Sequence, residues 1–330
     1  MKNTLNYLYS HKTLTREEAK TVLTNIAQGQ YNHSQIASFL SVYMMRNITV
    51  EELVGFRDAL LELCLAVPMD EYNTIDLCGT GGDGKNTFNI STLSSFVVAG
   101  AGYKVTKHGN IGVSSGCGSS NIMESLGYKF SSDHDKLRRE IEKTGICYLH
   151  APLFNPAMKN VAPVRKDLAV RTFFNMLGPM INPSFPKNQI VGVFSLELAR
   201  IYTYIYQQSG INFYILHSLD GYDEISLTSD FKVIGNEKDQ ILSPESLNLP
   251  RINPEDITSD KSVEESVKLF LNIIEGKGTP AQNNVVAVNS GLAIQCLNKN
   301  KKLEDCIELA REVLISGKAK QVLKHLIEMQ

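Results

Sequence analysis

Through the first 67 residues, apolar side chains recur every three to four positions, a spacing that gives a helix one buried face. Thr15 with Glu18, and Thr49 with Glu52, have the spacing of capping boxes and stand directly before apolar runs. Each box supplies partners for main-chain amides that a helix leaves unbonded at its start. The pattern predicts a small, mostly helical domain over residues 1–67.

From Thr74 onward, short runs of β-branched and aromatic residues alternate with runs of helical spacing. Strands separated by helices indicate a parallel sheet, because parallel neighbours need a long crossover connection. Residues 231–245 instead have the pattern of a short antiparallel extension. We therefore predict an α/β fold with a mainly parallel central sheet flanked by helices. The expected strands are 74–78, 103–107, 146–150, 189–194 and 213–217, and the expected helices are 91–101, 119–126, 133–144 and 195–208.

A proline-rich interval, residues 152–185, interrupts this alternation and contains no strand pattern. Between its prolines the spacing is helical, which resembles the N-terminal domain more than the sheet. We predict that this insert completes the small domain, which is then discontinuous in sequence. The large α/β domain would comprise residues 74–151 and 186–330, with a helix from Leu303 to Gly317 and one more helix after it.

The charge and composition exclude several classes of protein. With 330 residues, a net charge of −2 and a pI near 6.4, the chain has no electrostatic reason to bind nucleic acid or an anionic membrane. No apolar run approaches the roughly 20 residues of a membrane span, and the first residues lack the apolar core of a signal peptide. The six cysteines occur singly, which argues against disulfides and structural zinc. We expect a cytoplasmic protein.

Four glycines within six residues follow the first expected strand, in the run Gly79–Gly84. A strand, a glycine turn and a helix start together aim main-chain N–H groups at an anion, usually a phosphate. The spacing fits the dinucleotide fingerprint, but the next strand ends in Lys107-His108, where that fingerprint needs an acidic residue. The run also nearly fits a P-loop, but Asn86 replaces the Ser or Thr that ligates magnesium. A tight turn without a ligand is a third interpretation.

A second loop of this kind follows the next strand, at Lys107–Asn110, and small polar residues continue from Ser114 to Ser120. The carboxyl ends of neighbouring parallel strands meet at one edge of a sheet, where ligands of α/β folds bind. Two adjacent anion-binding loops predict a ligand with two separated phosphate groups, to which Lys107 adds a positive charge. His108 is a candidate general base, but we predict that it is not essential as one and has a structural or stacking role.

These motifs resemble the signature of the anthranilate phosphoribosyltransferase family, which belongs to a broader group shared with the pyrimidine nucleoside phosphorylases. The resemblance extends over nearly the whole chain, in the same order and at the same intervals. It is carried by Gly79–Asp83, Asn89–Thr92, Lys107–Asn110, Pro156–Met158, Val164–Lys166, Arg171–Asn175, Leu177–Pro179 and Asp223-Glu224.

The resemblance implies transfer of a phosphoribosyl group from phosphoribosyl pyrophosphate (PRPP) to the amino group of anthranilate, in tryptophan biosynthesis. It also implies a homodimer with a small helical domain and a large α/β domain, and two magnesium ions per subunit. Local support for a dimer contact through the N-terminal helices comes from an apolar stripe at Ile36, Phe39, Leu40 and Tyr43, most of which we expect in the core.

The family's binding residues can be carried over to matching positions of this chain. The resemblance implies that Ser91 and Glu224 hold one magnesium ion, and Asp223 with Glu224 the second. Gly79, Asn110 and Arg165 would contact anthranilate, with Arg171 as the alternative partner of its carboxylate, and no residue is assigned as acid or base. PRPP would be bound by Gly79, Gly82, Asp83, Thr87, Asn89, Ile90, Ser91, Thr92, Lys107, His108, Gly109, Asn110, Ile111, Gly112, Val113, Ser114, Ser115 and Ser119.

Three positions depart from the family pattern. Ile111 stands where the family commonly has Arg, Gly116 where it has Lys or Arg, and Asn155 where it often has His. Two positive charges are therefore missing near the expected phosphate loop. Two alternatives stay open: a pyrimidine nucleoside phosphorylase, disfavoured because Asp83–Asn86 replaces a Val-Gly-Asp-Lys run, and a non-enzymatic nucleic-acid-binding relative, disfavoured by the pI.

Overall fold

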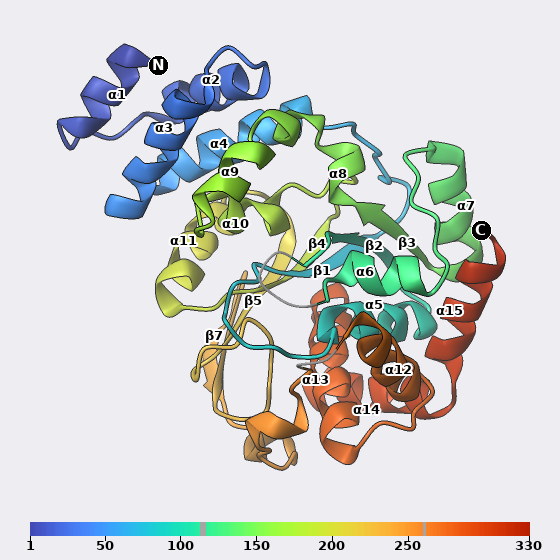
Figure 1. The fold of residues 1–330 in the computed structure, drawn as a ribbon. Helices are drawn as coiled ribbons and strands as arrows, with labels where there is room; N and C mark the ends of the chain where they lie inside the picture. The colour runs from blue at the N-terminus through green and yellow to red at the C-terminus, as the bar shows by residue number, and fades with distance from the viewer. Residues whose placement is uncertain (113–116, 260–261) are drawn as a thin grey trace. The chain divides into compact units, whose positions relative to one another are not determined.

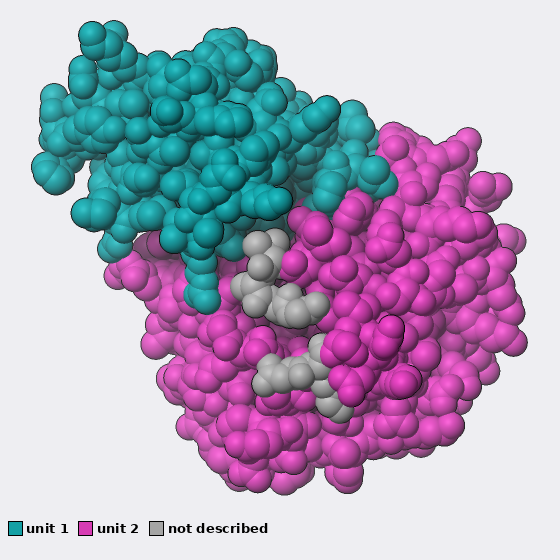
Figure 2. Space-filling model, in the orientation of Figure 1, with its two compact units in different colours: residues 1–68, 151–183 teal, residues 69–150, 184–330 magenta. Residues whose placement is uncertain are grey.

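The computed structural model describes residues 1–112, 117–259 and 262–330. The chain divides into two compact units, each formed by two separate segments (Figure 2). The helical unit comprises residues 1–68 and 151–183, and the α/β unit comprises residues 69–150 and 184–330. The domain boundaries inferred from the sequence differ from these by one to five residues.

The helical unit contains the capped helices that the sequence predicts. The capping boxes at Thr15 and Thr49 are both present, each with its glutamate accepting a hydrogen bond from the capping residue's amide. Residues 152–185, all of which are described, contain no strand. The first segment forms α1 (Lys2–Tyr9), α2 (Arg16–Ala27), α3 (His33–Met45) and α4 (Val50–Leu63). The second forms α8 (Ala151–Phe154), η1 (Pro156–Asn160), α9 (Ala162–Leu168), α10 (Phe174–Leu177) and η2 (Gly178–Met180).

An aromatic cluster joins the two segments of the helical unit. Phe39 and Tyr43 of α3 meet Phe56 of α4, and all three lie against Phe173 from the second segment. Phe56 and Phe173 stack with their ring centroids 4.4 Å apart. Burial of these rings is the physical reason that a distant, proline-rich segment folds back onto the first four helices.

The α/β unit is built on a seven-stranded sheet in the order β3-β2-β1-β4-β5-β6-β7 (Figure 1). The first five of these strands are parallel, and β6 and β7 are antiparallel, which confirms the predicted sheet and its extension. The strand order reverses direction between β1 and β4, which makes their carboxyl ends the expected place for a ligand. The strands are β1 (Thr74–Gly79), β2 (Lys104–Gly109), β3 (Ile146–His150), β4 (Asn188–Gly192), β5 (Asn212–Ser218), β6 (Phe231–Gly235) and β7 (Asp239–Leu242).

Helices flank this sheet, and the longest of them, α13, lies inside the unit. It packs against β4 and β5 as well as against α5 and α14. Because α13 is covered by both the sheet and other helices, it has no polar face. Its sequence therefore lacks the alternation of apolar and polar positions from which a helix is predicted. The helices are α5 (Ile90–Gly100), α6 (Ser119–Ser125), α7 (His134–Thr144), α11 (Leu196–Gln207), α12 (Val263–Ile274), α13 (Pro280–Leu297), α14 (Leu303–Ile315) and α15 (Lys318–Glu328), with 3-10 turns η3 (Glu245–Leu247) and η4 (Pro254–Asp256).

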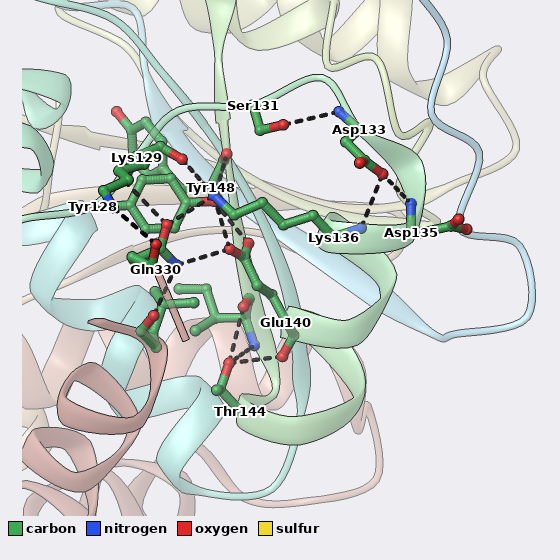
Figure 3. Close-up of polar contacts among 12 residues, drawn as sticks. Tyr128, Lys129, Ser131, Asp133, Asp135, Lys136, Glu140, Thr144, Tyr148 and Gln330 are labelled. Atoms are coloured by element: carbon green, nitrogen blue, oxygen red, sulfur yellow. Dashed lines mark hydrogen bonds and ion pairs between the residues drawn. The ribbon is translucent and has the colours of Figure 1, made fainter. Parts of the chain in front are cut away.

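A polar cluster around Glu140 ties the last residue of the chain to α7 and β3 (Figure 3). The buried Glu140 carboxylate accepts hydrogen bonds from the Tyr128 hydroxyl at 2.7 Å and the Gln330 side-chain amide at 3.0 Å. The Lys136 ammonium lies 3.4 Å from the same carboxylate and donates to the Gln330 side-chain oxygen. Burial raises the pKa of Glu140, and these three donors oppose the rise. The cluster therefore satisfies a carboxylate that would otherwise be buried without partners.

No helix in the described part of the chain is both long and apolar enough to cross a membrane.

All six cysteines, which lie within the described ranges, are free thiols, and Cys147, Cys296 and Cys306 are buried. Burial raises the pKa of each of these three thiols, so they are held in the unreactive protonated form.

Candidate functional site

Strands β1 and β4 end side by side in glycines, and a later turn of the chain passes directly over both ends. Gly79 and Gly192 are partners in the parallel register. A Cβ atom added to Gly192 would lie 1.5 Å from the main-chain oxygen of Asp223, and one added to Gly79 would lie 2.6 Å from the Asp223 carboxylate. Only glycine therefore leaves room for this turn at the point where the strand order reverses.

The turn after β5 carries two adjacent carboxylates into this place. The Asp223 carboxylate accepts a hydrogen bond from the Gly81 amide at 2.6 Å, and Glu224 accepts one from the Ser91 amide, at the start of α5, at 3.3 Å. The Asn289 side chain on α13 holds the residue after Glu224 by bonding to both its amide and its carbonyl. A pocket at this point is lined by Leu77, Cys78, Gly79, Ser91, Ser94, Ile190, Gly192, Leu216, Asp223, Glu224 and Asn289.

The positive charge of Lys107 does not offset the burial of the two carboxylates. Burial, followed by repulsion from the Asp83 carboxylate, raises the pKa of Asp223 to about 7. Burial and then repulsion from Asp223 raise the pKa of Glu224 well above its ordinary value, although the charge of Lys107 opposes this. The Oε2 atom of Glu224 is buried, and no described residue forms a hydrogen bond with it. Such a pair favours a cation, because a cation would stabilise both ionised carboxylates and the orphaned oxygen.

The donor set is suited to magnesium. The Ser91 hydroxyl and the two carboxylates are oxygen ligands, which magnesium prefers, and it often binds proteins through one or two carboxylates plus waters and substrate phosphates. Among the described residues, no group of three or more His, Cys, Asp or Glu side chains could hold a metal ion. With one hydroxyl and two carboxylates, Ser91, Asp223 and Glu224 fit a magnesium ion whose other ligands would be waters and phosphate oxygens.

The glycine loop is shaped by left-handed backbone. Gly81, Gly82 and Gly84 have φ values of 64°, 76° and 74°, which other residues adopt only with strain. Within the loop, the Asp83 carboxylate accepts a hydrogen bond from the Lys85 amide at 3.0 Å. The loop therefore needs several glycines, which explains their number, and its Gly81 amide bonds to the Asp223 carboxylate.

The second loop begins at the end of β2, beside β1. Lys107 is 2% exposed, and its ammonium donates to the main-chain oxygen of Leu77 at 2.6 Å. Its charge therefore lies among the strand ends, where it opposes the rise in the pKa of Glu224. His108 is equally buried, and its amide donates to the Asp76 carboxylate at 3.1 Å. In this structure the Lys107 ammonium therefore acts on the carboxylates of the site, through its charge near Glu224.

The α/β unit brings most of the expected PRPP and metal residues to one edge of the sheet. Ile90 and Thr92 are each only 1% exposed, so in this structure neither residue presents surface to a ligand. Val113, Ser114 and Ser115 lie outside the described residues. The residues at this edge are Gly79, Gly82, Asp83 and Thr87 of the glycine loop, Asn89–Thr92 at the start of α5, Lys107–Gly112 and Ser119 of the second loop, and Asp223 and Glu224.

Arg165 belongs to the helical unit, on the short helix α9. Its guanidinium donates to the Asn175 side-chain oxygen at 3.3 Å and lies 5.3 Å from the centre of the Phe174 ring. Burial lowers its pKa, and no described acidic side chain opposes this effect. A partly buried arginine without a carboxylate partner is available for an anionic ligand.

Some residues that shape the site could not be recognised in the sequence. Gly192 is a single glycine at a strand end, and its need to be glycine depends on a turn that arrives 31 residues later. Asn289 lies in an apolar helix and contacts the turn only after folding. Tyr148 on β3 is buried and bonds to the expected ligand residue Ser119. No local motif marks any of these three positions.

Comparison with known proteins agrees with this architecture. Residues 2–64 match the description "Glycosyl transferase family, helical bundle domain", and residues 71–320 match "Glycosyl transferase family, a/b domain". The chain is 61% identical to an anthranilate phosphoribosyltransferase of Flavobacterium psychrophilum and 55% identical to one of Bacteroides fragilis, covering 100% of this chain and 99% of each relative.

Solved structures of the same kind share the fold. The anthranilate phosphoribosyltransferase of Thermus thermophilus is 31% identical, with a TM-score of 0.91 and 98% of both chains covered. One from Saccharomyces cerevisiae, in complex with PRPP and Mg, is 24% identical, with a TM-score of 0.90 and coverage of 100% of this chain and 98% of that chain. These comparisons give no support to the nucleoside phosphorylase or the nucleic-acid-binding alternative. With relatives this similar over its whole length, the chain belongs to the anthranilate phosphoribosyltransferase family.

Proposed function

We propose that the protein transfers the 5-phosphoribosyl group of PRPP to the amino group of anthranilate, giving N-(5-phosphoribosyl)anthranilate and pyrophosphate. The observation that carries this proposal is the meeting of Asp223 and Glu224 with the glycine loop and the start of α5, in a chain of this family. Support also comes from the yeast relatives, solved in complex with PRPP and Mg and with 4-fluoroanthranilate. We place the reaction in tryptophan biosynthesis, in the cytoplasm.

The reaction needs anion stabilisation more than a strong base. As the bond between C1 of the ribose and the pyrophosphate oxygen breaks, its electron pair leaves with the pyrophosphate, and the amine nitrogen forms the new bond to C1. Negative charge therefore grows on the leaving group, where oriented main-chain N–H groups and a cation are effective. The aromatic amine is uncharged at neutral pH, so it needs positioning and loses its proton after attack. The reaction therefore needs no general base, and His108, which is 2% exposed and whose main-chain amide donates to the Asp76 carboxylate, is assigned none of the proton transfer.

Magnesium would bind at the edge of the sheet through Ser91, Asp223 and Glu224. We propose two ions per subunit, one held by Ser91 and Glu224 and the other by Asp223 and Glu224. When bound, magnesium would neutralise charge on the leaving pyrophosphate. The protein's own contribution is to hold the two carboxylates in place through the amides of Gly81 and Ser91. The residues Gly79–Thr92 and Lys107–Ser119 assigned to PRPP would then surround the phosphates of the substrate.

The proposed reaction can be tested directly on the purified protein. We expect the intrinsic fluorescence of anthranilate to fall when protein, PRPP and magnesium are mixed with it, and the decrease to stop when magnesium is chelated. Thymidine and uridine with phosphate serve as competing substrates. If anthranilate is not consumed while either nucleoside undergoes phosphorolysis, the protein is a nucleoside phosphorylase and the proposal is wrong.

Arg165 is the proposed anchor of the anthranilate carboxylate. Arg165→Ala should raise KM for anthranilate about 10- to 100-fold with little change in kcat, because a hydrogen bond to a charged group contributes about 1.5–3 kcal/mol to binding. KM for PRPP should stay the same. Arg171→Ala is the matched control, since Arg171 is exposed on the same segment. If Arg171→Ala raises KM for anthranilate and Arg165→Ala does not, the assignment of the anchor is reversed.

Homodimerisation through the N-terminal helices is also part of the proposal. Tyr7 and Tyr9 on α1, and Met44 and Met45 at the end of α3, are large apolar side chains that remain exposed in the helical unit. Ile36, Phe39 and Leu40 are buried in the core of this unit and are not available for such a contact. Because α1 and α3 pack against each other, these side chains lie on neighbouring helices, and they are the local support for a surface that another chain covers.

A further inference from the structure

A chain of buried polar groups leads from β3 to Ser119, one of the residues assigned to PRPP. The Tyr148 hydroxyl donates to the Ser119 Oγ at 2.7 Å, and it lies 3.0 Å from the Ser120 Oγ. The Ser120 Oγ in turn lies 2.8 Å from the Nδ1 atom of His150. Tyr148 is 1% exposed and Ser120 is 0% exposed, whereas Ser119 is partly exposed. The hydrogen bonds thus run from half-buried His150 through two buried groups to Ser119, a partly exposed residue.

Because each hydroxyl has only one proton, the bond from Tyr148 to Ser119 sets the direction of the other two hydrogen bonds. The Tyr148 hydroxyl has one proton, which it gives to Ser119, so its contact with Ser120 requires Ser120 to donate. The Ser120 proton is then used as well, so the contact with His150 requires its Nδ1–H to donate. Burial raises the pKa of Tyr148, so the phenol keeps the proton that it donates. His150, Ser120 and Tyr148 therefore each donate in the direction of Ser119.

Ser119 is left with a proton that is held only loosely. Its acceptor side is taken by Tyr148 at 2.7 Å, and its own proton goes to the main-chain oxygen of Asn110 at 3.4 Å. The usual O–H···O distance is about 2.7–2.8 Å, so this last bond is long. An anion near Ser119 would accept that proton better than the distant carbonyl does, and a hydroxyl that already accepts a bond is a stronger donor.

The geometry points to Tyr148, Ser120 and His150 as positioning residues that orient the Ser119 hydroxyl as a hydrogen-bond donor to a phosphate group of PRPP. This inference rests on the proposed function, in which Ser119 contacts PRPP. It adds three neutral donors behind a loop that lacks the positive charges expected at Ile111 and Gly116.

Two close contacts hold these hydrogen-bonded side chains in place. A Cβ atom on Gly109 would lie 2.1 Å from the Tyr148 hydroxyl and 2.3 Å from the Ser119 Oγ, so the glycine gives these two groups their space. At the other end, the His150 ring stacks on Phe130 with centroids 4.3 Å apart and planes 17° from parallel. Tyr148 is also fixed through its main-chain amide, which donates to the Tyr128 hydroxyl at 3.4 Å, and both tyrosines are labelled in Figure 3.

A double-mutant cycle tests whether Tyr148 acts through Ser119. Tyr148→Phe should raise KM for PRPP, and the dissociation constant measured by calorimetry with PRPP and magnesium, about fivefold. This is the size expected for one hydrogen bond, and kcat and KM for anthranilate should stay the same because the bond is present in ground and transition states alike. In a Ser119→Ala background, Tyr148→Phe should have no further effect. The same loss in both backgrounds, or a fall in kcat instead, would overturn the inference.

Variants of His150 and Ser120 supply matched controls. His150→Phe keeps the ring on Phe130 but removes the donor, whereas His150→Asn removes the ring and keeps a donor near the Nδ1 position. We expect His150→Phe to raise the PRPP dissociation constant about threefold and His150→Asn to change it less; the reverse order contradicts the role of His150. Ser120→Ala should match Tyr148→Phe and serves if the latter does not fold. If the wild type binds PRPP but does not consume anthranilate, the proposed reaction fails while the binding cycle still decides this inference.

Discussion

The double variant Asp223→Asn, Glu224→Gln should lose at least about a thousandfold in kcat and still fold. The amide oxygens of Asn and Gln can accept the same hydrogen bonds from the Gly81 and Ser91 amides, so the turn keeps its place. The amides carry no charge, however, and cannot bind a divalent cation against the growing charge of the pyrophosphate. Losing even one preorganised stabilising group of this kind typically costs 10²–10³ in rate.

Turnover and thermal unfolding together distinguish this effect from misfolding. Magnesium with PRPP should raise the melting temperature of the wild type, because a ligand that binds only the folded state stabilises it. The double variant should melt cooperatively and show little or no such increase. Asp220→Asn is the matched control, since Asp220 is an exposed carboxylate in the same turn that bonds to Thr228 and Ser229. Turnover by the double variant at wild-type rates, with low magnesium, would show that the metal ligands lie elsewhere.

Gly192→Ala should reduce activity about a hundredfold and destabilise the protein by about 1–3 kcal/mol. The added methyl group would lie 1.5 Å from the main-chain oxygen of Asp223, which no side-chain rotation relieves. The turn must therefore move away from the end of β4, and overpacking of this kind typically costs about that much stability. A displacement of about 1 Å in groups that position a substrate is enough for a hundredfold loss of rate.

Chemical denaturation and steady-state kinetics check this expectation. The loss of activity should appear with a weaker apparent affinity for magnesium, because the displaced carboxylates no longer meet the start of α5. If Gly192→Ala has wild-type activity and an unchanged free energy of unfolding, the turn is able to shift without cost, and the close packing over β4 is not part of the site.

The sequence predicted most of the fold because its local patterns agree with the tertiary structure. The capping boxes at Thr15 and Thr49 begin helices, as expected from partners only three residues apart. The five parallel strands and the antiparallel extension were recognised from β-branched runs and the helices between them. The buried helix α13 was missed, since a helix covered all round has no polar face to reveal its period.

The candidate site divides in the same way. The two loops, at Gly79–Gly84 and Lys107–Asn110, were recognisable because each is a contiguous motif at the end of an expected strand. The sequence did not reveal, however, in which direction the Lys107 ammonium points. A charge on a phosphate loop was the natural expectation, yet its ammonium bonds to the Leu77 carbonyl and faces the carboxylate side of the site.

The sequence by itself therefore determined the kind of ligand and the segments that would bind it. These segments are a glycine loop, a second donor-rich loop and an adjacent pair of carboxylates. These depend on neighbours within a few positions, where backbone sterics and hydrogen bonding act directly. Only the folded structure decided that Asp223, 142 residues beyond Gly81, bonds to that glycine's amide, that Gly192 must be glycine, and that Tyr148 backs Ser119. Those relations arise when the sheet brings distant strand ends together, and no local pattern encodes such a distance.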